Sequence, residues 1–173
     1  TASAFSFLAG ASLPETLITR AADLGYPALA LLDRDGVYGA PQFYRAAKAA
    51  GLKAIVGAEL TIGGAQVGAQ VGAHGSAQRV QTPWTLPVLV GSQEGYRNLC
   101  RLITQAKRDV PKGESRLALE DLEGHTTGLI ALVGRQALVA QRHGVGGLVD
   151  KIVGIFGRQH VWMELQRHLR RDE

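Results

Sequence analysis

The stretch of residues 28–60 limits what this chain can fold into more than any other part of the sequence. It contains an apolar run at residues 28–32, a helical pattern at residues 40–50 that stops at Gly51, and a second apolar run at residues 54–56. Two short apolar runs separated by one helix are typical of two buried parallel strands with a crossover helix between them. The sequence therefore predicts a βαβ unit here.

Polar residues cluster where these two predicted strands end. Asp33, Arg34 and Asp35 follow the first apolar run, and Glu59 follows the second, just beyond Gly57. Ligands of open or barrel-closed parallel sheets sit at the carboxyl ends of the strands. We therefore expect any chemistry that this domain has, or once had, to involve Asp33, Asp35 and Glu59.

The rest of the chain continues to alternate between strand and helix patterns. A short apolar cluster around Phe5, Phe7 and Leu8, which we expect to point inward, precedes a helix with Ser12 as its N-cap and Gly25 as its stop. Further strands are predicted at residues 86–90, 128–133 and 160–165. Further helical segments are predicted at residues 93–108, 118–122, 136–141 and 148–156. This alternation indicates an α/β fold with parallel strands.

Residues 63–78 form a Gly-rich tract in which the tetrad GAQV occurs twice in a row. Such a composition cannot bury a core or hold a helix, so we expect a flexible loop or a loose hairpin tip. His74 lies in this tract, and a single histidine in a flexible loop is more often solvated than bound to a metal.

Composition favours one soluble globular domain, because the 173 residues are 46% hydrophobic and 20% charged. The net charge of +4 permits an acidic partner such as nucleic acid but does not require one. A single cysteine, Cys100, excludes an internal disulfide framework and fits the cytoplasm, and its helical position suggests that it fills the core. No apolar run is long enough to span a membrane. The chain lacks an initial methionine and ends in a helical-looking segment, so we expect a piece truncated at both ends.

Standard catalytic motifs are missing from the sequence. We find no Gly-x-Gly-x-x-Gly after a strand, no GxxxxGK[ST] loop, no recognisable Ser/His/Asp set and no zinc-type spacing of Cys and His. Nucleotide binding by the two glycine-rich devices is therefore unsupported.

Six segments in a fixed order carry a family resemblance. They are FSFLAGAS (residues 5–12), LLDRDGVYG (31–39), VGAEL (56–60), SQEGYRNLCRLIT (92–104), KGESRLALEDL (112–122) and MELQRH (163–168). Together they resemble the N-terminal PHP (polymerase and histidinol phosphatase) domain of bacterial C-family DNA polymerases, the class of the replicative α subunit. The Lys-Gly-Glu segment, and Asp33-Arg34 where many relatives have Asp-His, make the chain most similar to the error-prone member of that class.

The resemblance implies a partial, distorted β/α (TIM-like) barrel with mostly parallel strands and a metal cluster at their carboxyl ends. It also implies ligands that this chain lacks. Alanine stands where the family has a histidine (Ala2) and an acidic residue (Ala9), and Thr85 falls near another histidine position. Ser3 and Glu59 match the family. The resemblance therefore predicts a degenerate site made of Ala2, Ala9, Asp33, Arg34, Asp35 and Glu59.

Arg34 replaces a histidine ligand with a permanent cation, which opposes a metal ion electrostatically. Such clusters need several imidazoles and carboxylates that converge on the ion. We therefore expect no metal or other cofactor in this fragment. Our hypothesis is that Arg34 replaces the charge of the metal by pairing with Glu59, or with Asp33 or Asp35.

The resemblance leads first to the hypothesis of a structural domain in an error-prone DNA polymerase that would use Mg²⁺ elsewhere in its chain. Its partners would be the rest of the polymerase chain, DNA bound through the parent protein, and replication or mutagenesis subunits, with no membrane.

Two alternatives remain open at this point. Intact members of the family can be metal-dependent phosphoesterases or 3′–5′ exonucleases, against which Ala2, Ala9 and Arg34 argue. A stand-alone nucleic-acid-binding module is suggested by the basic residues Arg167, Arg170 and Arg171, which are possible DNA contacts. Aromatic residues make up only 6% of the chain, so stacking on bases is poorly supported.

Overall fold

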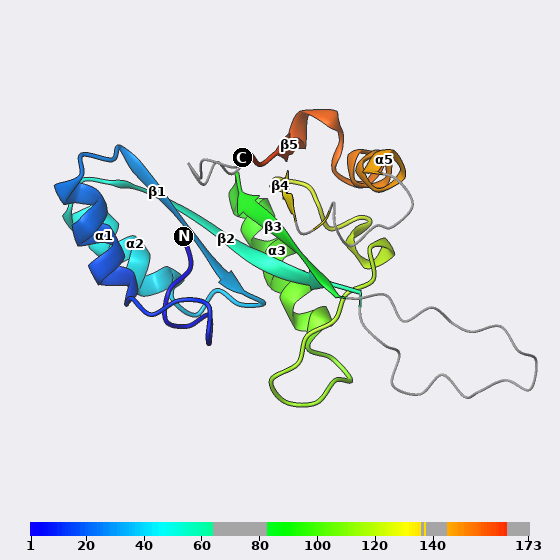
Figure 1. Cartoon of the computed structure of the whole chain (residues 1–173), viewed down its shortest axis with the longest axis horizontal. Helices are drawn as coiled ribbons and strands as arrows, with labels where there is room; N and C mark the ends of the chain where they lie inside the picture. Colours follow the sequence, from blue (N-terminus) through cyan, green and yellow to red (C-terminus); the bar gives the residue numbers. More distant parts are fainter. Residues whose placement is uncertain (64–82, 136, 138–144, 166–173) are drawn as a thin grey trace, which may run out of the picture.

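The structure is a computed structural model, and it describes residues 1–63, 83–135, 137 and 145–165. Figure 1 shows how these residues are arranged and gives the labels of the helices and strands. The elements in chain order are α1 (Pro14–Asp23), β1 (Ala28–Arg34), α2 (Ala40–Ala49), β2 (Lys53–Ile62), β3 (Trp84–Val90), α3 (Gln93–Ala106), the 3₁₀ turn η1 (Glu120–Leu122), β4 (Leu129–Val133), α5 (Val145–Phe156), the 3₁₀ turn η2 (Arg158–His160) and β5 (Val161–Met163).

The strands β1 to β5 form one sheet in the order β1-β2-β3-β4-β5. The pairs β1–β2 and β4–β5 are parallel, whereas β3 is antiparallel to both of its neighbours. The α/β class and the mostly parallel sheet are confirmed, but the expectation of parallel strands throughout is wrong for β3. The reason lies in the connection between β2 and β3, because residues 63–78 carry no helical pattern and parallel neighbours need a long crossover.

The strand β2 is longer than its apolar run at residues 54–56 predicts. Its second half stays extended because β3 pairs with it, from Gly57 opposite Leu89 to Ile62 opposite Trp84. We expected Glu59 beyond the end of this strand, but the structure places it within β2.

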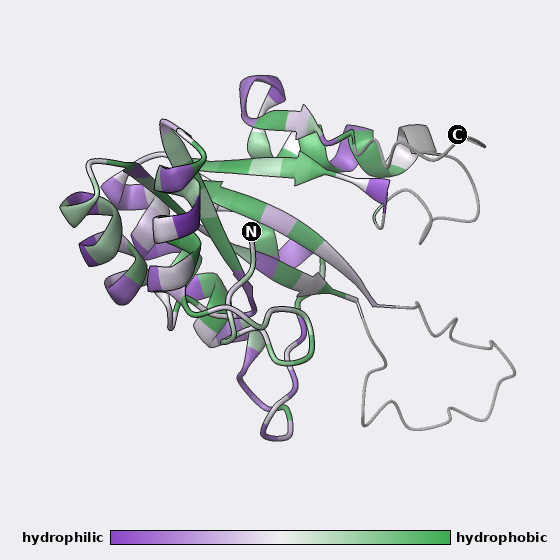
Figure 2. Ribbon diagram, turned by 60° about the vertical axis from the view of Figure 1, so that its left-hand side comes forward, coloured by the Kyte–Doolittle hydropathy of each residue, from purple (hydrophilic) through white to green (hydrophobic). Residues whose placement is uncertain are grey.

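The helices pack against one face of the sheet through two apolar clusters. In the smaller cluster, Ile18 of α1 and Phe43 of α2 meet Leu31 of β1. In the larger cluster, Leu99 of α3 and Ile152 of α5 join buried residues of β2, β3 and β4. Figure 2 shows the strands mostly in green, the hydrophobic end of the scale, whereas the helices alternate between purple and green. This alternation fits helices that bury one side and expose the other.

Register decides which face of the sheet each polar residue occupies. Asp33 is opposite Ala58, and Ala58 is opposite Val88, so Asp33 shares the face that the helices cover. Arg34 and Glu59 are neighbours in the same register and point to the other face.

The helix α3 starts where the sequence predicts, at Gln93. Ser92 is its N-cap, and the backbone N–H of Gly95 donates to the Ser92 hydroxyl at 3.1 Å. Leu99 and Leu102 are fully buried, whereas Tyr96 is exposed. Cys100 is only partly buried and lines a surface cleft, so the expectation that it fills the core is wrong.

The N-terminal segment departs from the sequence predictions in two respects. The helix α1 has Leu13, not Ser12, as its N-cap, with no side-chain capping bond. Phe5, Phe7 and Leu8 are exposed and do not point inward.

Several predicted features lie outside the described residues. These features are most of the Gly-rich tract at residues 63–78, most of the helical segment at residues 136–141, and the basic cluster of Arg167, Arg170 and Arg171. Among the helices of the described part, none is long and apolar enough to cross a membrane.

Candidate functional site

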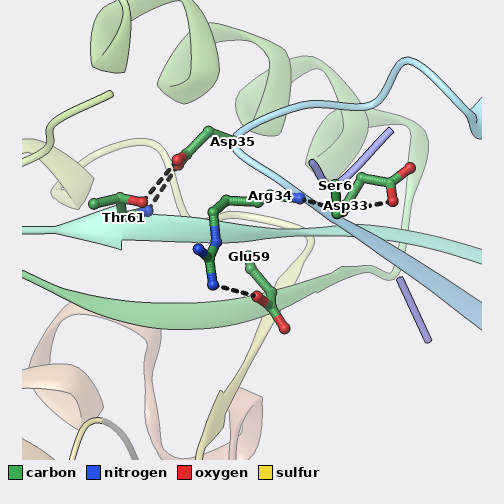
Figure 3. A network of polar contacts seen from close by, with 6 residues as sticks. All are labelled: Ser6, Asp33, Arg34, Asp35, Glu59 and Thr61. Carbon is green, nitrogen blue, oxygen red and sulfur yellow. Dashed lines mark hydrogen bonds and ion pairs between the residues drawn. The ribbon is translucent and has the colours of Figure 1, made fainter. Parts of the chain in front are cut away.

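Asp33 lies near the end of β1 with only 1% of its surface exposed. Its carboxylate accepts hydrogen bonds from the backbone N–H of Ser3 (2.7 Å), from the Ser3 hydroxyl (2.9 Å to each oxygen) and from the Ser6 hydroxyl (2.8 Å). The Ser6 oxygen in turn accepts from the backbone N–H of Arg34 at 3.0 Å (Figure 3). Asp33 therefore fastens the N-terminal loop to the end of β1.

Asp35 follows β1 in a left-handed backbone conformation, with φ of +48°. Aspartate tolerates this region better than most residues because its short side chain bonds locally. Its backbone N–H donates to the carbonyl oxygen of Glu59 at 2.9 Å. Its carboxylate accepts from the backbone N–H of Thr61 at 2.8 Å and from the Thr61 hydroxyl at 2.7 Å. Asp35 therefore ties the end of β1 to β2.

Arg34 and Glu59 form an ion pair on the face of the sheet opposite the helices, as Figure 3 shows. Their closest atoms, Nη2 of Arg34 and Oε2 of Glu59, are 3.9 Å apart, with 48% and 32% of the side chains exposed. This distance is too long for a direct hydrogen bond, so the contact is electrostatic. Burial raises the pKa of the Glu59 carboxyl, and the Arg34 guanidinium offsets part of that rise.

Glu164 is a fourth carboxylate at this edge of the sheet, after Asp33, Asp35 and Glu59, and the sequence patterns did not single it out. Its backbone N–H donates to the carbonyl oxygen of Val133 at 3.0 Å, which places it just past the ends of β4 and β5. Its charge also contributes to the raised pKa of the Glu59 carboxyl, after the larger effect of burial. The signal in the sequence was its place at the end of the fifth predicted strand.

Ser6 and Thr61 are the other site residues that sequence reasoning missed. Ser6 belongs to the FSFLAGAS segment, which was noticed for its apolar residues, and Thr61 follows Glu59 by two positions on β2. The Ser6 hydroxyl donates a hydrogen bond to the carboxylate of Asp33, and the Thr61 hydroxyl donates one to the carboxylate of Asp35.

The structure places Asp33, Arg34 and Asp35 at the end of β1 and Glu59 beside them on β2, with Asp33 on the face that the helices cover and Arg34 and Glu59 on the other. Ala2 lies next to the buried Ser3. Ala9 is exposed on the N-terminal loop. The methyl side chains of Ala2 and Ala9 have no atom that could bind a metal.

The donor set of this site does not fit the metal cluster that the family resemblance implies. Asp33 and Asp35 have their carboxylate oxygens engaged by protein donors, and Glu59 has a guanidinium beside it. Transition-metal sites need several imidazole or carboxylate ligands that converge on one point. Within residues 1–63, 83–135, 137 and 145–165, no three His, Cys, Asp or Glu side chains are grouped so that they could hold a metal ion.

Two clefts lie near this edge and share part of their walls. A cleft of about 320 Å³ is lined by Arg34, Asp35 and Thr61 together with residues of the 109–116 loop. A larger cleft of about 920 Å³ lies between α3 and that loop, and Asp109, Val110 and Arg116 line both. None of Asp33, Arg34, Asp35 and Glu59 lines the larger cleft. Its size therefore does not support a catalytic site there.

Comparison with protein families decides the classification, because the PHP domain model matches residues 1–168 of this chain. The chain belongs to the PHP domain family. Among curated relatives, the error-prone DNA polymerase of Ralstonia nicotianae is 43% identical over 119 residues, which cover 68% of this chain and 10% of the relative. The error-prone DNA polymerase of Cutibacterium acnes is 36% identical over an alignment of 179 residues, which covers 96% of this chain and 15% of the relative. The chain thus spans 10% and 15% of the length of these two relatives, and its homologues are parts of larger polymerase chains.

Solved structures of two hydrolase-type proteins share the fold of this PHP domain. A protein described as a metal-dependent phosphoesterase, from Bifidobacterium adolescentis, has a TM-score of 0.58 at 12% identity, and the match covers 88% of this chain and 72% of that one. An amidohydrolase from Chromobacterium violaceum has a TM-score of 0.59 at 16% identity, with 94% and 73% covered. At such low identities the likeness establishes the fold and not the activity.

Proposed function

We propose that this PHP domain is a metal-free structural unit of an error-prone DNA polymerase. The relatives support the parent, because two polymerases of that name match at 43% and 36% identity. The parent would add deoxynucleotides to a primer, with Mg²⁺ held by acidic residues of a separate catalytic domain. The domain would then act in the cytoplasm, with the rest of the polymerase chain as its first partner, DNA as a partner of the whole protein, and replication or mutagenesis subunits as further candidates.

The single observation that carries the structural role is the ion pair between Arg34 and Glu59. A guanidinium beside this carboxylate supplies the positive charge that a metal would otherwise bring, and it cannot lose its proton near neutral pH. Asp33 and Asp35 support the same interpretation, since each now holds two segments of chain together. In this proposal, contacts within the protein do what metal coordination does in intact members of the family.

The test uses the full-length protein encoded by the gene that contains this chain. We expect primer extension with Mg²⁺, and we expect Arg34→Ala to leave the extension rate at a permissive temperature within about twofold of the parent. Absence of any primer extension from the full-length protein would remove the polymerase assignment. A large loss of rate in Arg34→Ala, with the fold intact, would argue against a purely structural role for the domain.

The alternative of a metal-dependent phosphoesterase or 3′–5′ exonuclease is motivated by the family and by the phosphoesterase with the same fold. Its test is metal content after purification, together with hydrolysis of a generic phosphodiester and of single-stranded DNA in Mn²⁺ or Zn²⁺. Robust turnover that survives loss of the polymerase aspartates would favour this alternative. We expect no turnover above that of a heat-denatured sample.

A further inference from the structure

The N-terminal loop, residues 3–10, has its polar side chains inside and its large apolar side chains outside. Ser3 and Ser6 are 0% and 2% exposed, whereas Phe5, Phe7 and Leu8 are 42%, 85% and 93% exposed. Three large apolar side chains within four residues of the sequence are therefore exposed to water, and grouped exposed apolar side chains are typical of interaction sites. We call Phe5, Phe7 and Leu8 the apolar tip.

The apolar tip is held in place by contacts that leave it no simple way to turn inward. Within the loop, the backbone N–H groups of Ala9 and Gly10 donate to the carbonyl oxygen of Ser6 at 2.9 and 3.0 Å. A side chain at Gly10 would overlap the carbonyl oxygen of Ser3, so the loop closes tightly upon itself. Burying the tip in this domain would require Ser3 and Ser6 to leave the carboxylate of Asp33. The loop is therefore preorganised with the tip outward.

Leu8 adds a further observation, since it adopts a left-handed conformation with φ of +63°. A residue other than glycine loses conformational free energy in that geometry, and such outliers cluster at active sites, ligand clamps and switch regions. The side chain of Leu8 is also the most exposed of the three.

We propose that the apolar tip docks onto an apolar surface of the polymerase portion of the same polypeptide. This inference rests on the proposed function, because it requires that portion to be present. A tethered surface is the best candidate, since 119 residues make up only 10% of the Ralstonia relative and linkage in one chain gives a high effective concentration.

Other occupants fit the apolar tip less well. A stable interface between separate proteins takes roughly 20–30 residues on each side, many more than this tip offers. The segment of residues 1–12 carries no Lys or Arg, which membrane-surface segments and nucleic-acid contacts use. A small, uncharged and rigid tip is therefore suited to a partner that is already held nearby.

The experiment places a photo-cross-linking benzoylphenylalanine at Phe7 in the full-length protein. The matched control carries the same group at Tyr44, an aromatic residue of α2 that is 57% exposed. We expect irradiation to give an intramolecular cross-link from position 7 to the polymerase portion, mapped by mass spectrometry, at a yield at least fivefold above that from position 44. Cross-links to a second copy, equal yields at both positions, or no cross-link from position 7 would each overturn the proposal.

A second variant tests the same contact without a bulky probe. Because Phe7 and Leu8 are exposed, Phe7→Ser combined with Leu8→Ser leaves the domain folded, and we expect proteolytic separation of the domain from the polymerase portion to become at least fivefold faster. Tyr44→Ser is the control and leaves that rate unchanged. Primer extension on the same preparations separates the two claims. Primer extension without the cross-link would contradict only the docking, whereas absence of primer extension would contradict both the docking and the proposed function.

Discussion

Asp33 is a buried carboxylate that accepts hydrogen bonds from hydroxyl and amide donors of Ser3 and Ser6. Removing the acceptor leaves buried donors without their partner, and each such loss costs about 1–3 kcal/mol. We expect Asp33→Ala to lower the free energy of unfolding by roughly 3 kcal/mol, measured by urea denaturation. The control is Asp23→Ala, at the exposed end of α1. A change in Asp33→Ala no larger than in this control would show that the network contributes nothing to stability.

Glu59 gives the site a pH dependence with a definite sign. Burial raises the pKa of its carboxyl, and the Arg34 guanidinium beside it limits the rise. When folding raises the pKa of a carboxyl, the protonated form of that group stabilises the folded state. This contribution is complete below the pKa of the unfolded chain, about 4.3, and is lost as the pH rises through the pKa of the folded state. Arg34→Met removes the limiting charge, so we expect a higher pKa of Glu59 and a steeper loss of stability across this window.

The measurement is a ¹³C NMR titration of the Glu59 carboxyl, combined with urea unfolding at several pH values. Because the pair is half-exposed, we expect Arg34→Met to cost only about 0.2–1 kcal/mol at neutral pH. Glu59→Gln removes the titrating group and serves as the control, with a flatter pH profile in both backgrounds. An unchanged pKa of Glu59 in Arg34→Met would mean that the ion pair has no energetic role.

The sequence located part of this site for a clear physical reason. Asp33, Arg34 and Asp35 directly follow an apolar run, so their place at a strand end could be predicted from local pattern alone. The pairing of Arg34 with Glu59 was one of three options, and only the strand register selects it. Glu164 could not be assigned to the site from the sequence. It follows β5, and its position relative to Glu59 on β2 depends on how β3 and β4 are placed between those two strands.

Helices and strands were predictable where one segment carries its own periodicity. The strand β1 and the helix α2 were found because apolar spacing and the stop at Gly51 are local signals. The extent of β2 and the direction of β3 were not, because both depend on the pairing of the two strands across residues 63–83. Pairing is a tertiary property that single-segment patterns do not contain.

Gly57 tests how closely β2 and β3 must approach each other. A Cβ atom at this position would overlap the carbonyl oxygen of Val88 and would come within 3.3 Å of the Leu32 side chain. Since a backbone oxygen cannot move aside without breaking the ladder, we expect Gly57→Ala to destabilise the domain by roughly 3 kcal/mol or more. Thermal unfolding followed by circular dichroism measures the effect.

The matched control for Gly57→Ala is Gly154→Ala in α5. A Cβ atom at Gly154 meets nothing within 4 Å, and alanine is the better helix former by about 0.8–1.0 kcal/mol. We therefore expect Gly154→Ala to raise the melting temperature slightly. If both alanine variants behave alike, the close approach of β3 to β2 is not what demands glycine.

The domain as a unit keeps the fold of its family, and the polar side chains of the predicted degenerate site contact other groups of the protein. The order of six motifs was enough to predict the family, because several matches in one order are more specific than any one of them. The same resemblance named the positions of the predicted degenerate site, but it did not predict which groups contact Asp33, Asp35 and Glu59 there. Hydroxyl and amide groups donate to Asp33 and Asp35, the Arg34 guanidinium lies beside Glu59, and these contacts follow from packing around the end of β1.

Metal removal tests this account on the thermal stability of the protein. An ion bound only to the folded state at 100 times its Kd would stabilise it by about 2.7 kcal/mol, which is worth roughly 5–10 °C in a domain of this size. We expect a strong chelator to shift the melting temperature of the domain by less than about 1 °C, because the charges and donors of the site satisfy one another. Adding Mn²⁺ or Zn²⁺ should shift it as little.

Glu59→Gln is the control, since it deletes the carboxylate that pairs with Arg34, and its response to the chelator should match that of the parent. A fall of several degrees in the parent, reversed by Mn²⁺ or Zn²⁺ and absent in Glu59→Gln, would place a metal at Glu59 and contradict the structural role proposed for Arg34.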